Sequence, residues 1–481
     1  MLFSSEAPQF PENSEWLNTD MPLSLKALKG HVVVLDFWTY CCINCIHVMP
    51  DLKMLEEEYA EQPVVFIGVH SAKFDNENDA KNIRSAVERY EITHPVVVDK
   101  DHAIWNSYGV SGWPTIVIVG TDGKIAYKRS GEGQLHEMDA SISALLKKGP
   151  LSEKIRITTP ESNRKTVLSF PGKIDYHDGT LVISDSGHNR ILVTELQGTK
   201  AKVLHEVGSG RAGLMDGNFA SAAFNKPQGV ALDNETIYVA DTENHAVRLI
   251  SLKSKKVQTL AGNGEQSAGE PRNRRLNSPW DVLLRNGTLF MAMAGSHQIW
   301  EMDMTYRSLR PYAGTSGENI TDGPKETALL AQPSGLAADG EFLYFADSEV
   351  SALRRIGFTS GIVETLIGKG LFVFGRADGP FGSALLQHPL GVDCYAGKAY
   401  IADTYNHAIR VADLKARTVS TLISKKHSRV CMLGDAECSY LPLYEPNDVI
   451  ATKDGLIIAD TNNHLIRIFK DNKLVDVEIV F

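Results

Sequence analysis

The amino-acid sequence predicts a multidomain protein, with an N-terminal α/β domain followed by an all-β domain that forms a six-bladed β-propeller. Residues 20–147 alternate strand-like and helix-like segments, which is typical of an α/β layer structure. From about residue 166 the helical patterns vanish, and a unit of four short strand-like runs appears six times. A chain of 481 residues is too long for one ordinary core, so two or more domains are expected.

The first domain is expected to span residues 1–147. Its strand-like segments are residues 32–37, 64–69, 96–98, 115–119 and 124–127, and its helix-like segments are residues 45–60, 77–90 and 135–147. The mostly polar residues 148–165 contain Pro150 and Pro160 and are interpreted as a linker, although residues 154–158 could form a strand. The propeller is then expected to span residues 166–481.

The repeat is clearest in three copies of Ile/Val-Ala-Asp-Thr-x-Asn-His, at residues 239–245, 401–407 and 458–464. Residues 183–189 and 345–348 are looser copies, and residues 291–297 are a degenerate one. Six stacked units close into a ring, which removes the exposed end blades of an open array. The simple count assigns four strands to every blade, so no strand exchange between the first and last blades is expected. Residues 474–481 are then the outermost strand of blade six.

The repeating Asp, Asn, His and Arg residues are interpreted as blade-stabilising rather than as a metal or acid–base site. Residues that occur once per blade are spread around the ring, so their copies cannot converge on one ion. Asp-Thr and Asn-His at strand ends readily form hydrogen bonds with the backbone of turns. The degenerate third copy reflects either sequence drift without a function or a specialised binding face. Long interblade connections contain Asp-Gly pairs at residues 216–217, 322–323 and 378–379; they are either partner-binding loops or simple bridges.

Composition limits the possible partners and compartments. The net charge is −10, so neither nucleic acid nor an anionic membrane is expected as the main partner. The longest apolar stretches have strand length, and residues 1–11 are polar and contain proline, so neither a transmembrane helix nor a signal peptide is expected. Six cysteines are too few for a disulfide scaffold. We therefore expect a cytoplasmic protein.

Three of the cysteines lie in one short segment. Cys42 and Cys45 are two residues apart, between an apolar run and a helical pattern, which is the arrangement of a reactive dithiol. The helix start leaves unpaired N–H groups and a partial positive charge beside the first sulfur, and both stabilise a thiolate. A zinc site would need a fourth ligand beside Cys41, Cys42 and Cys45, for which His47 is the local candidate. His47 is more simply placed one turn into the helix, where it tunes the thiolate or meets solvent.

The other three cysteines belong to the propeller half. Cys394 lies at a strand position and is expected in the core. Cys431 and Cys438 lie in the loop before blade six and are interpreted as free thiols, with an internal redox partner for Cys42 as the alternative.

Residues 20–147 resemble the thioredoxin-like domains of the thioredoxin and TlpA type. The resemblance is carried by Asp36-Phe-Trp38-x-x-Cys41-Cys42-x-x-Cys45 and by residues 98–115, which contain Trp113-Pro114. It implies that Cys42 is the attacking thiolate and Cys45 the resolving thiol. It further implies that Asp36 is the buried acid that moves a proton at the resolving sulfur, and that Pro114 is a cis-proline that docks a client strand.

The chain departs from that pattern at three places. Cys41 replaces the usual tryptophan and could compete with Cys45 as the resolving thiol. Ile43-Asn44 replaces the usual Gly-Pro or Pro-Pro, so no reduction potential can be carried over. Trp113 is bulky where the family prefers a small or β-branched residue, and it could partly cover the sulfurs.

The propeller repeats resemble NHL repeats, with Pro-x-Gly-Val at residues 227–230 and 389–392. The combined chain resembles the NHL repeat-containing protein 2 family, in its shorter bacterial form. The leading hypothesis is a thiol–disulfide oxidoreductase whose propeller recruits a protein client, with an external thiol reductant and neither cofactor nor metal. The alternative is a non-enzymatic scaffold in which both domains bind proteins, and a propeller hydrolase or lyase is a weaker third.

Overall fold

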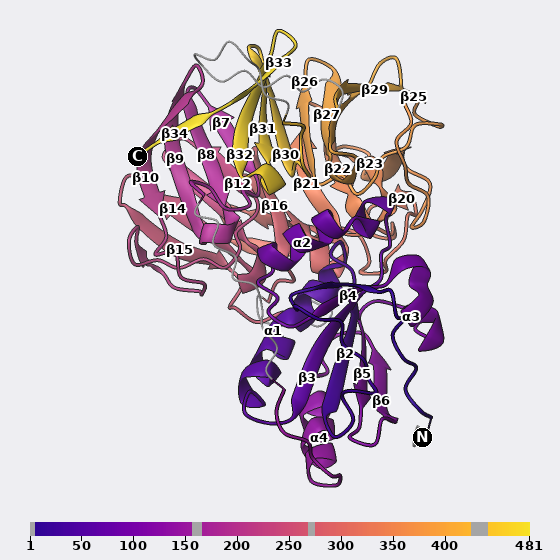
Figure 1. Ribbon diagram of the computed structural model, residues 1–481. Helices are drawn as coiled ribbons and strands as arrows, with labels where there is room; N and C mark the ends of the chain where they lie inside the picture. Colours follow the sequence, from indigo (N-terminus) through magenta and orange to yellow (C-terminus); the bar gives the residue numbers. More distant parts are fainter. Residues whose placement is uncertain (1–4, 156–165, 268–274, 425–440) are drawn as a thin grey trace, which may run out of the picture. The chain divides into compact units, whose positions relative to one another are not determined.

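The computed structural model describes residues 5–155, 166–267, 275–424 and 441–481 (Figure 1). The chain divides into two compact units, Met1–Arg164 and Lys165–Phe481. Within the described ranges, no helix is long and apolar enough to cross a membrane.

The first unit is built on a six-stranded mixed sheet with the strand order β1-β4-β3-β2-β5-β6. Strands β2, β3 and β4 are parallel, and β1, β5 and β6 run antiparallel to their neighbours. The strand bounds are β1 Glu15–Leu17, β2 Val32–Trp38, β3 Val64–His70, β4 Val96–Val98, β5 Thr115–Val119 and β6 Ile125–Ser130. Every residue of β2 is buried, as expected for a central strand covered on both faces.

Helices cover both faces of this sheet. Helix α1 packs Val48 and Leu52 into one core together with Met138 of α4, and the N-terminal segment and α3 contribute Phe10 and Ile104 to the core of the other face. The helix bounds are α1 Ile43–Glu58, α2 Ala80–Arg89, α3 Ala103–Ser107 and α4 Leu135–Leu146, with short 3₁₀ helices η1 Asp75–Asn78 and η2 Lys100–His102. The thioredoxin-like α/β fold is therefore confirmed.

The differences from the expected elements are local. The three-residue β1 and five-residue α3 are too short to show a periodicity, and the sequence did not predict them. The helix expected over residues 77–90 is divided, because the Asp79 carboxylate accepts the Lys81 N–H (2.9 Å) and starts α2 there. Ser152, in the expected linker, donates its N–H to the Gly30 carbonyl (3.0 Å). Residues 154 and 155 are not in a strand, and the rest of the possible strand over 154–158 lies outside the described residues.

The second unit is a six-bladed propeller whose blades each contain four consecutive antiparallel strands (Figure 1). The count of four is exceeded in blades two, four and five, where a two-residue strand of the preceding connection pairs with the fourth strand: β11 Gly217–Asn218, β20 Gly323–Pro324 and β25 Gly379–Pro380. Blades one to three comprise β7 Ile174–His177, β8 Thr180–Asp185, β9 Arg190–Gln197 and β10 Lys200–Val207; β12 Val230–Asp233, β13 Thr236–Asp241, β14 Ala246–Ser251 and β15 Lys256–Ala261; and β16 Pro279–Arg285, β17 Thr288–Met293, β18 Gln298–Asp303 and β19 Ser308–Ala313. Blades four to six comprise β21 Pro333–Ala338, β22 Phe342–Asp347, β23 Ala352–Gly357 and β24 Ile362–Ile367; β26 Gly391–Tyr395, β27 Lys398–Asp403, β28 Ala408–Asp413 and β29 Thr418–Ile423; and β30 Asp448–Thr452, β31 Gly455–Asp460, β32 Leu465–Lys470 and β33 Lys473–Asp476.

The expectation for the last strand is wrong. Strand β33 completes blade six, and the chain then crosses to blade one, where β34 (Glu478–Val480) pairs in parallel with β10 (Figure 1). Residues 474–481 read as one β-run in the sequence, and only the single residue Val477 separates the two strands. Blade one therefore contains both the first and the last strand of the ring, which joins the two ends of the propeller.

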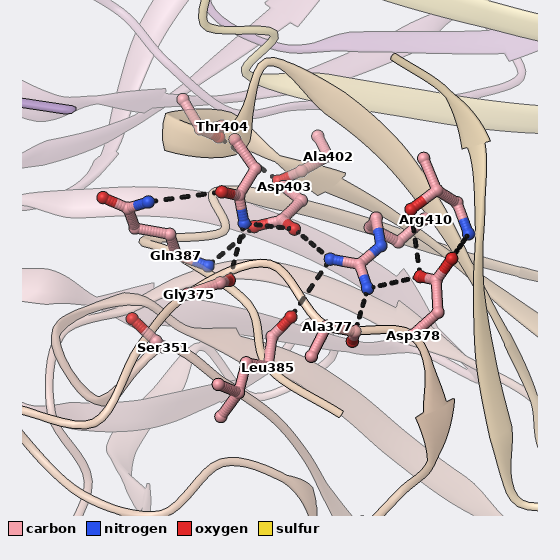
Figure 2. Close-up of polar contacts among 12 residues, drawn as sticks. Ser351, Gly375, Ala377, Asp378, Leu385, Gln387, Ala402, Asp403, Thr404 and Arg410 are labelled. Carbon is pink, nitrogen blue, oxygen red and sulfur yellow. Dashed lines mark hydrogen bonds and ion pairs between the residues drawn. The ribbon is translucent and has the colours of Figure 1, made fainter. Parts of the chain in front are cut away.

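A buried ion pair links the second and third strands of a blade, as Figure 2 shows for blade five. Arg410 Nη1 lies 2.7 Å from Asp403 Oδ2, and both side chains are fully buried. Arg410 Nη2 also binds Asp378 of the preceding connection at 2.7 Å. The corresponding triads are Asp241–Arg248–Asp216 in blade two and Asp347–Arg354–Asp322 in blade four. The Asp-Gly pairs of the long connections therefore supply a second carboxylate for the buried arginines.

The histidine and the threonine of the repeat join neighbouring blades. His407 accepts the Glu445 N–H at Nδ1 (3.0 Å), and Thr404 donates its hydroxyl to the Pro446 carbonyl (2.8 Å). The same contacts at His464 and Thr461 reach Phe170 and Pro171 of blade one, and so close the ring. The blade-stabilising interpretation of the repeat is confirmed.

Blade three replaces the ion pair with apolar side chains. Met293 stands at the aspartate position and Trp300 at the arginine position, and they are 0% and 2% exposed. Both belong to the core cluster between blades two and three, and the Trp300 indole donates to Gln298 Oε1 (3.0 Å). Because both members of the pair have changed together, no charge is left unpaired. The degenerate copy is core packing, not a binding face.

Candidate active site

The dithiol lies where β2 ends and α1 begins. Cys42 is the N-cap residue of α1, and its sulfur accepts the backbone N–H of Cys45 at 3.3 Å. The Cys42 carbonyl accepts the N–H groups of Cys45 (3.0 Å) and Ile46 (3.2 Å). The sulfur thus takes the place of the hydroxyl or carboxylate oxygen of an ordinary N-cap, at the positive end of the helix dipole.

The three clustered cysteines differ in access to solvent. Cys42 is half-buried, whereas Cys41 and Cys45 are 2% and 1% exposed. Among the described residues, none of the three forms a disulfide bond. Burial, followed by the hydrogen bond and the charge of Cys42, raises the pKa of Cys45 well above its ordinary value. A reagent can therefore reach Cys42 first, and Cys45 keeps its proton until a nearby base accepts it.

Asp36 provides a candidate for that base. It is buried within β2, and burial raises its pKa to about 7, with the charge of His94 acting in the opposite direction. The Asp36 charge in turn contributes to the raised pKa of Cys45, so the two groups are electrostatically linked. A carboxyl group with a pKa near neutrality can both accept and release a proton at physiological pH.

Trp113 and Pro114 lie next to this site in the family pattern. The Trp113–Pro114 peptide bond is cis. The Trp113 indole donates to the Ser71 carbonyl (2.9 Å), and its ring lies 4.5 Å from that of Trp105 in α3. These contacts fix the indole, and Cys42 remains half-buried rather than sealed.

Cys41 is held by a residue that sequence reasoning missed. Glu77 Oε1 accepts the backbone N–H of Cys41 (2.9 Å), and Glu77 Oε2 accepts those of Lys73 and Phe74 (both 2.9 Å). The Glu77 side chain is fully buried, so one carboxylate fixes both the residue before the dithiol and a distant turn. The polar segment at residues 75–78 was the available signal, but it reads equally well as a helix start.

His47 and Trp38 lie on either side of the dithiol in the sequence. His47 Nδ1 lies 2.7 Å from Glu132 Oε2 and its side chain is only 4% exposed, so the expectation that it meets solvent is wrong. The fully buried Trp38 ring lies edge-on to that of His70, 4.9 Å away. Among the residues that the structure describes, no group of three or more His, Cys, Asp or Glu side chains is placed to hold a metal.

The propeller channel contains charged groups that the repeat did not reveal. Lys173 is 1% exposed, and its ammonium donates to the Leu390 carbonyl (2.7 Å). It lies 3.4 Å from Asp281 and 3.7 Å from Asp448, which occupy equivalent positions of other innermost strands. Glycine at the remaining equivalent positions makes room, since a Cβ at Gly335 would lie 2.6 Å from the Leu390 oxygen. Lys173 gives the buried carboxylates an internal counter-charge, so this arrangement adds no support for a hydrolase or lyase.

Of the three propeller cysteines, only Cys394 lies among the described residues. Cys394 is a free, half-buried thiol in β26 that packs against the core between blades four and five, so the expected core position is confirmed only in part. Cys431 and Cys438 lie outside the described residues.

Comparison with known proteins agrees with this architecture. A thioredoxin-like family model matches residues 30–125, and an NHL-repeat model matches residues 224–248. Thiol-disulfide oxidoreductase ResA of Halalkalibacterium halodurans is 31% identical over 26% of this chain and 68% of its own length. The fold and site thus define a thioredoxin-like domain related to thiol–disulfide oxidoreductases, followed by an NHL propeller.

Two longer relatives match nearly the whole chain. NHL repeat-containing protein 2 of Homo sapiens is 40% identical over 98% of this chain and 71% of its own length. The chain belongs to the NHL repeat-containing protein 2 family. Protein SUPPRESSOR OF QUENCHING 1, chloroplastic, of Arabidopsis thaliana is 42% identical over 99% of this chain, which spans 48% of that relative's length.

Proposed function

We propose that this chain is a cytoplasmic thiol–disulfide oxidoreductase that acts on a protein client recruited by the propeller. The observation that carries the proposal is the unequal placement of the two sulfurs. Cys42 is half-buried and caps the N-terminus of α1, whereas Cys45 is buried and electrostatically linked to Asp36. An accessible nucleophile beside a protected second thiol is the arrangement that dithiol exchange needs.

In the reducing direction, the Cys42 thiolate attacks one sulfur of a client disulfide, and the other client sulfur leaves as a thiolate that takes up a proton. Cys45 then loses its proton to Asp36 and attacks Cys42 in the mixed disulfide. The second client sulfur leaves as a thiolate and is protonated. The client disulfide gains two electrons, the dithiol loses two, and an external thiol reductant restores the dithiol.

Native alkylation tests this proposal. The full chain is treated briefly with iodoacetamide at neutral pH, and modified cysteines are located by mass spectrometry. Fast modification of one thiol, lost in Cys42→Ser and retained in the matched variants Cys41→Ser and Cys394→Ser, is expected. Uniformly slow cysteines would contradict the oxidoreductase and leave the interaction scaffold as the better reading of both domains.

A further inference from the structure

Asp36 lies on the face of the sheet that α1 and α4 cover. Alternate residues of a strand share a face, and Val32 and Val34 of β2 pack in the core with α1 and α4. Asp36 and Trp38 continue this row toward the dithiol. Gly68 of β3 lies opposite Asp36 in the parallel register, so it belongs to the same face.

Because Gly68 has no side chain, polar groups approach its Cα closely. A Cβ at this position would lie 2.9 Å from Trp38 Nε1 and 3.3 Å from His94 Nε2. Asp36 Oδ1 and Trp38 Nε1 are buried, and neither has a hydrogen-bond partner within the described part of the chain. The indole donor and the imidazole nitrogen therefore both lie beside Gly68, and the unpartnered carboxyl oxygen belongs to the residue opposite it in the sheet. An ordered internal water needs two to four such partners.

His94 connects this region to a second carboxylate. Its Nδ1 lies 2.6 Å from Glu56 Oε1, and Glu56 Oε2 accepts the Thr93 hydroxyl (3.1 Å). Asn18 holds the backbone here by donating to the His94 carbonyl (3.2 Å). Because a carboxylate only accepts, the ring carries its proton on Nδ1, and a neutral ring presents the lone pair of Nε2 toward Gly68.

Glu56 connects the His94 ring to solvent. Glu56, Thr93 and His94 line a surface cavity of about 220 Å³ on the first unit. The Glu56 side chain is 20% exposed and that of His94 is 9% exposed. Groups that can carry a proton are thus present between Asp36 and the surface, with His94 beside Gly68 and Glu56 at the cavity.

We propose that Asp36, Trp38 and His94 hold one internal water above Gly68, and that the His94–Glu56 pair carries the proton of Asp36 between this water and solvent. The relay rests on the proposed oxidoreductase function, whereas the water site does not. Asp36 is the acid–base group at the dithiol, and His94 and Glu56 are positioning and relay residues behind it.

The proton balance of one turnover is complete. Asp36 takes the Cys45 proton as the sulfur attacks, and passes it to the water while the water gives a proton to His94 Nε2. The His94 Nδ1 proton moves to Glu56, and Glu56 releases it to solvent. The ring returns to its first tautomer by exchange with solvent through the surface cavity. No oxidant or reductant beyond the client disulfide is involved in these steps.

The charges that act on Asp36 agree with this path. Besides burial, the groups that shift its pKa are His94, which lowers it, and Glu56, which raises it. On the dithiol side, Asp36 and Cys42 both raise the pKa of Cys45. Replacing His94, whose ring lowers the pKa of Asp36 when it is protonated, is therefore expected to raise the pKa of Asp36 further.

The water site is tested without any turnover. In the reduced full chain, the Trp38 indole proton is expected to show a nuclear Overhauser effect to a long-lived water, and Gly68→Ala should remove it. Absence of this signal in the wild type overturns the water site, whatever the fate of Gly68→Ala. Carbon-13 titration of Asp36 should show a higher pKa in His94→Gln, and an unchanged pKa overturns the coupling.

The relay is tested by single-turnover release of a client thiol from the Cys42 mixed disulfide. His94→Gln is expected to slow release by about 10–100-fold, the range for a positioned acid–base group. In His94→Ala, added imidazole should restore most of the rate through the surface cavity. The exposed His136→Gln on α4 is the matched control and should behave as wild type.

The outcomes separate the relay from the proposed function. A His94→Gln variant as fast as wild type overturns the relay, and so does a slow His94→Ala that imidazole does not rescue. A wild-type chain without any exchange overturns the oxidoreductase and with it the relay, while the Trp38 and Asp36 measurements still decide the water site.

Discussion

Arg410 and Asp403 form a 2.7 Å ion pair in which neither side chain is exposed to solvent. Asp403 also accepts the Gln387 N–H at Oδ1 and the Asn406 side-chain N–H at Oδ2 (both 2.8 Å), so both of its oxygens accept hydrogen bonds. Burial alone raises the pKa of Asp403, and the Arg410 charge opposes that rise. The repeat therefore places a charge in the core of a blade only together with its counter-charge.

Removing one member of this ion pair should lower the unfolding free energy more than replacing both members with apolar residues. Arg410→Met leaves Asp403 buried and unpaired, and we expect a loss of about 3–5 kcal/mol in the unfolding free energy of the propeller. The double variant Asp403→Met/Arg410→Trp copies Met293 and Trp300 of blade three and should lie within about 2 kcal/mol of wild type. Urea unfolding followed by circular dichroism gives both values. A double variant that is less stable than Arg410→Met would show that blade three is a special case.

Asp36 should make the stability of the first unit depend on pH. Its pKa is raised from 3.8 to about 7, so the folded chain keeps a proton that the unfolded chain releases. The stability of wild type relative to Asp36→Asn should fall by about 1.4 kcal/mol per pH unit as the pH rises from about 4 to about 7, and then stay level. Tryptophan-fluorescence unfolding at a series of pH values measures this difference. The buried aspartates of the propeller are common to both variants and cancel, and a pH-independent difference would contradict the raised pKa.

Lys173 should be required for the stability of the propeller centre. Lys173→Met removes the ammonium that lies 3.4 Å from Asp281 and 3.7 Å from Asp448, and we expect a loss of about 3–5 kcal/mol near neutral pH. The loss should shrink at acidic pH, because protonation of the two carboxylates removes the unpaired charge. Thermal unfolding at about pH 5 and about pH 8 tests this, with the exposed Lys398→Met as the control. An equal loss at both pH values would mean that packing, not charge, is what Lys173 supplies.

Strand β34, which joins the two ends of the ring, should also stabilise the propeller. Glu478→Pro removes the N–H group that β34 donates to the Thr199 carbonyl next to β10 (2.8 Å). We expect faster amide exchange in β10 and a lower propeller unfolding temperature, by several degrees. Glu478→Gln changes only an exposed ion pair with Lys200 and should have little effect. Unchanged exchange at residues 200–202 would show that β34 contributes little to ring closure.

The sequence by itself determined the fold class and the local chemistry of the dithiol. Hydrophobic periodicity is a property of neighbouring residues, so the strands at 32–37 and 115–119 and the change from helix to repeat could be predicted. The repeat spacing was enough for six blades, and the Asp-Thr and Asn-His pairs were enough for a structural interpretation of the motif. The likeness to thioredoxin-like domains supplied Cys42, Cys45, Asp36 and Pro114 as candidates.

Only the tertiary structure decided which distant residues meet. The pairing of β34 with β10, the contact of Lys173 with Asp281 and Asp448, and the position of Glu77 over Cys41 join segments that are far apart in the chain. The same holds for His94 and Glu56, whose charges act on Asp36 although His94 precedes β4, two strands away from β2, and Glu56 belongs to α1. Burial and charge pairing depend on these long-range contacts, and no local pattern of residues encodes them.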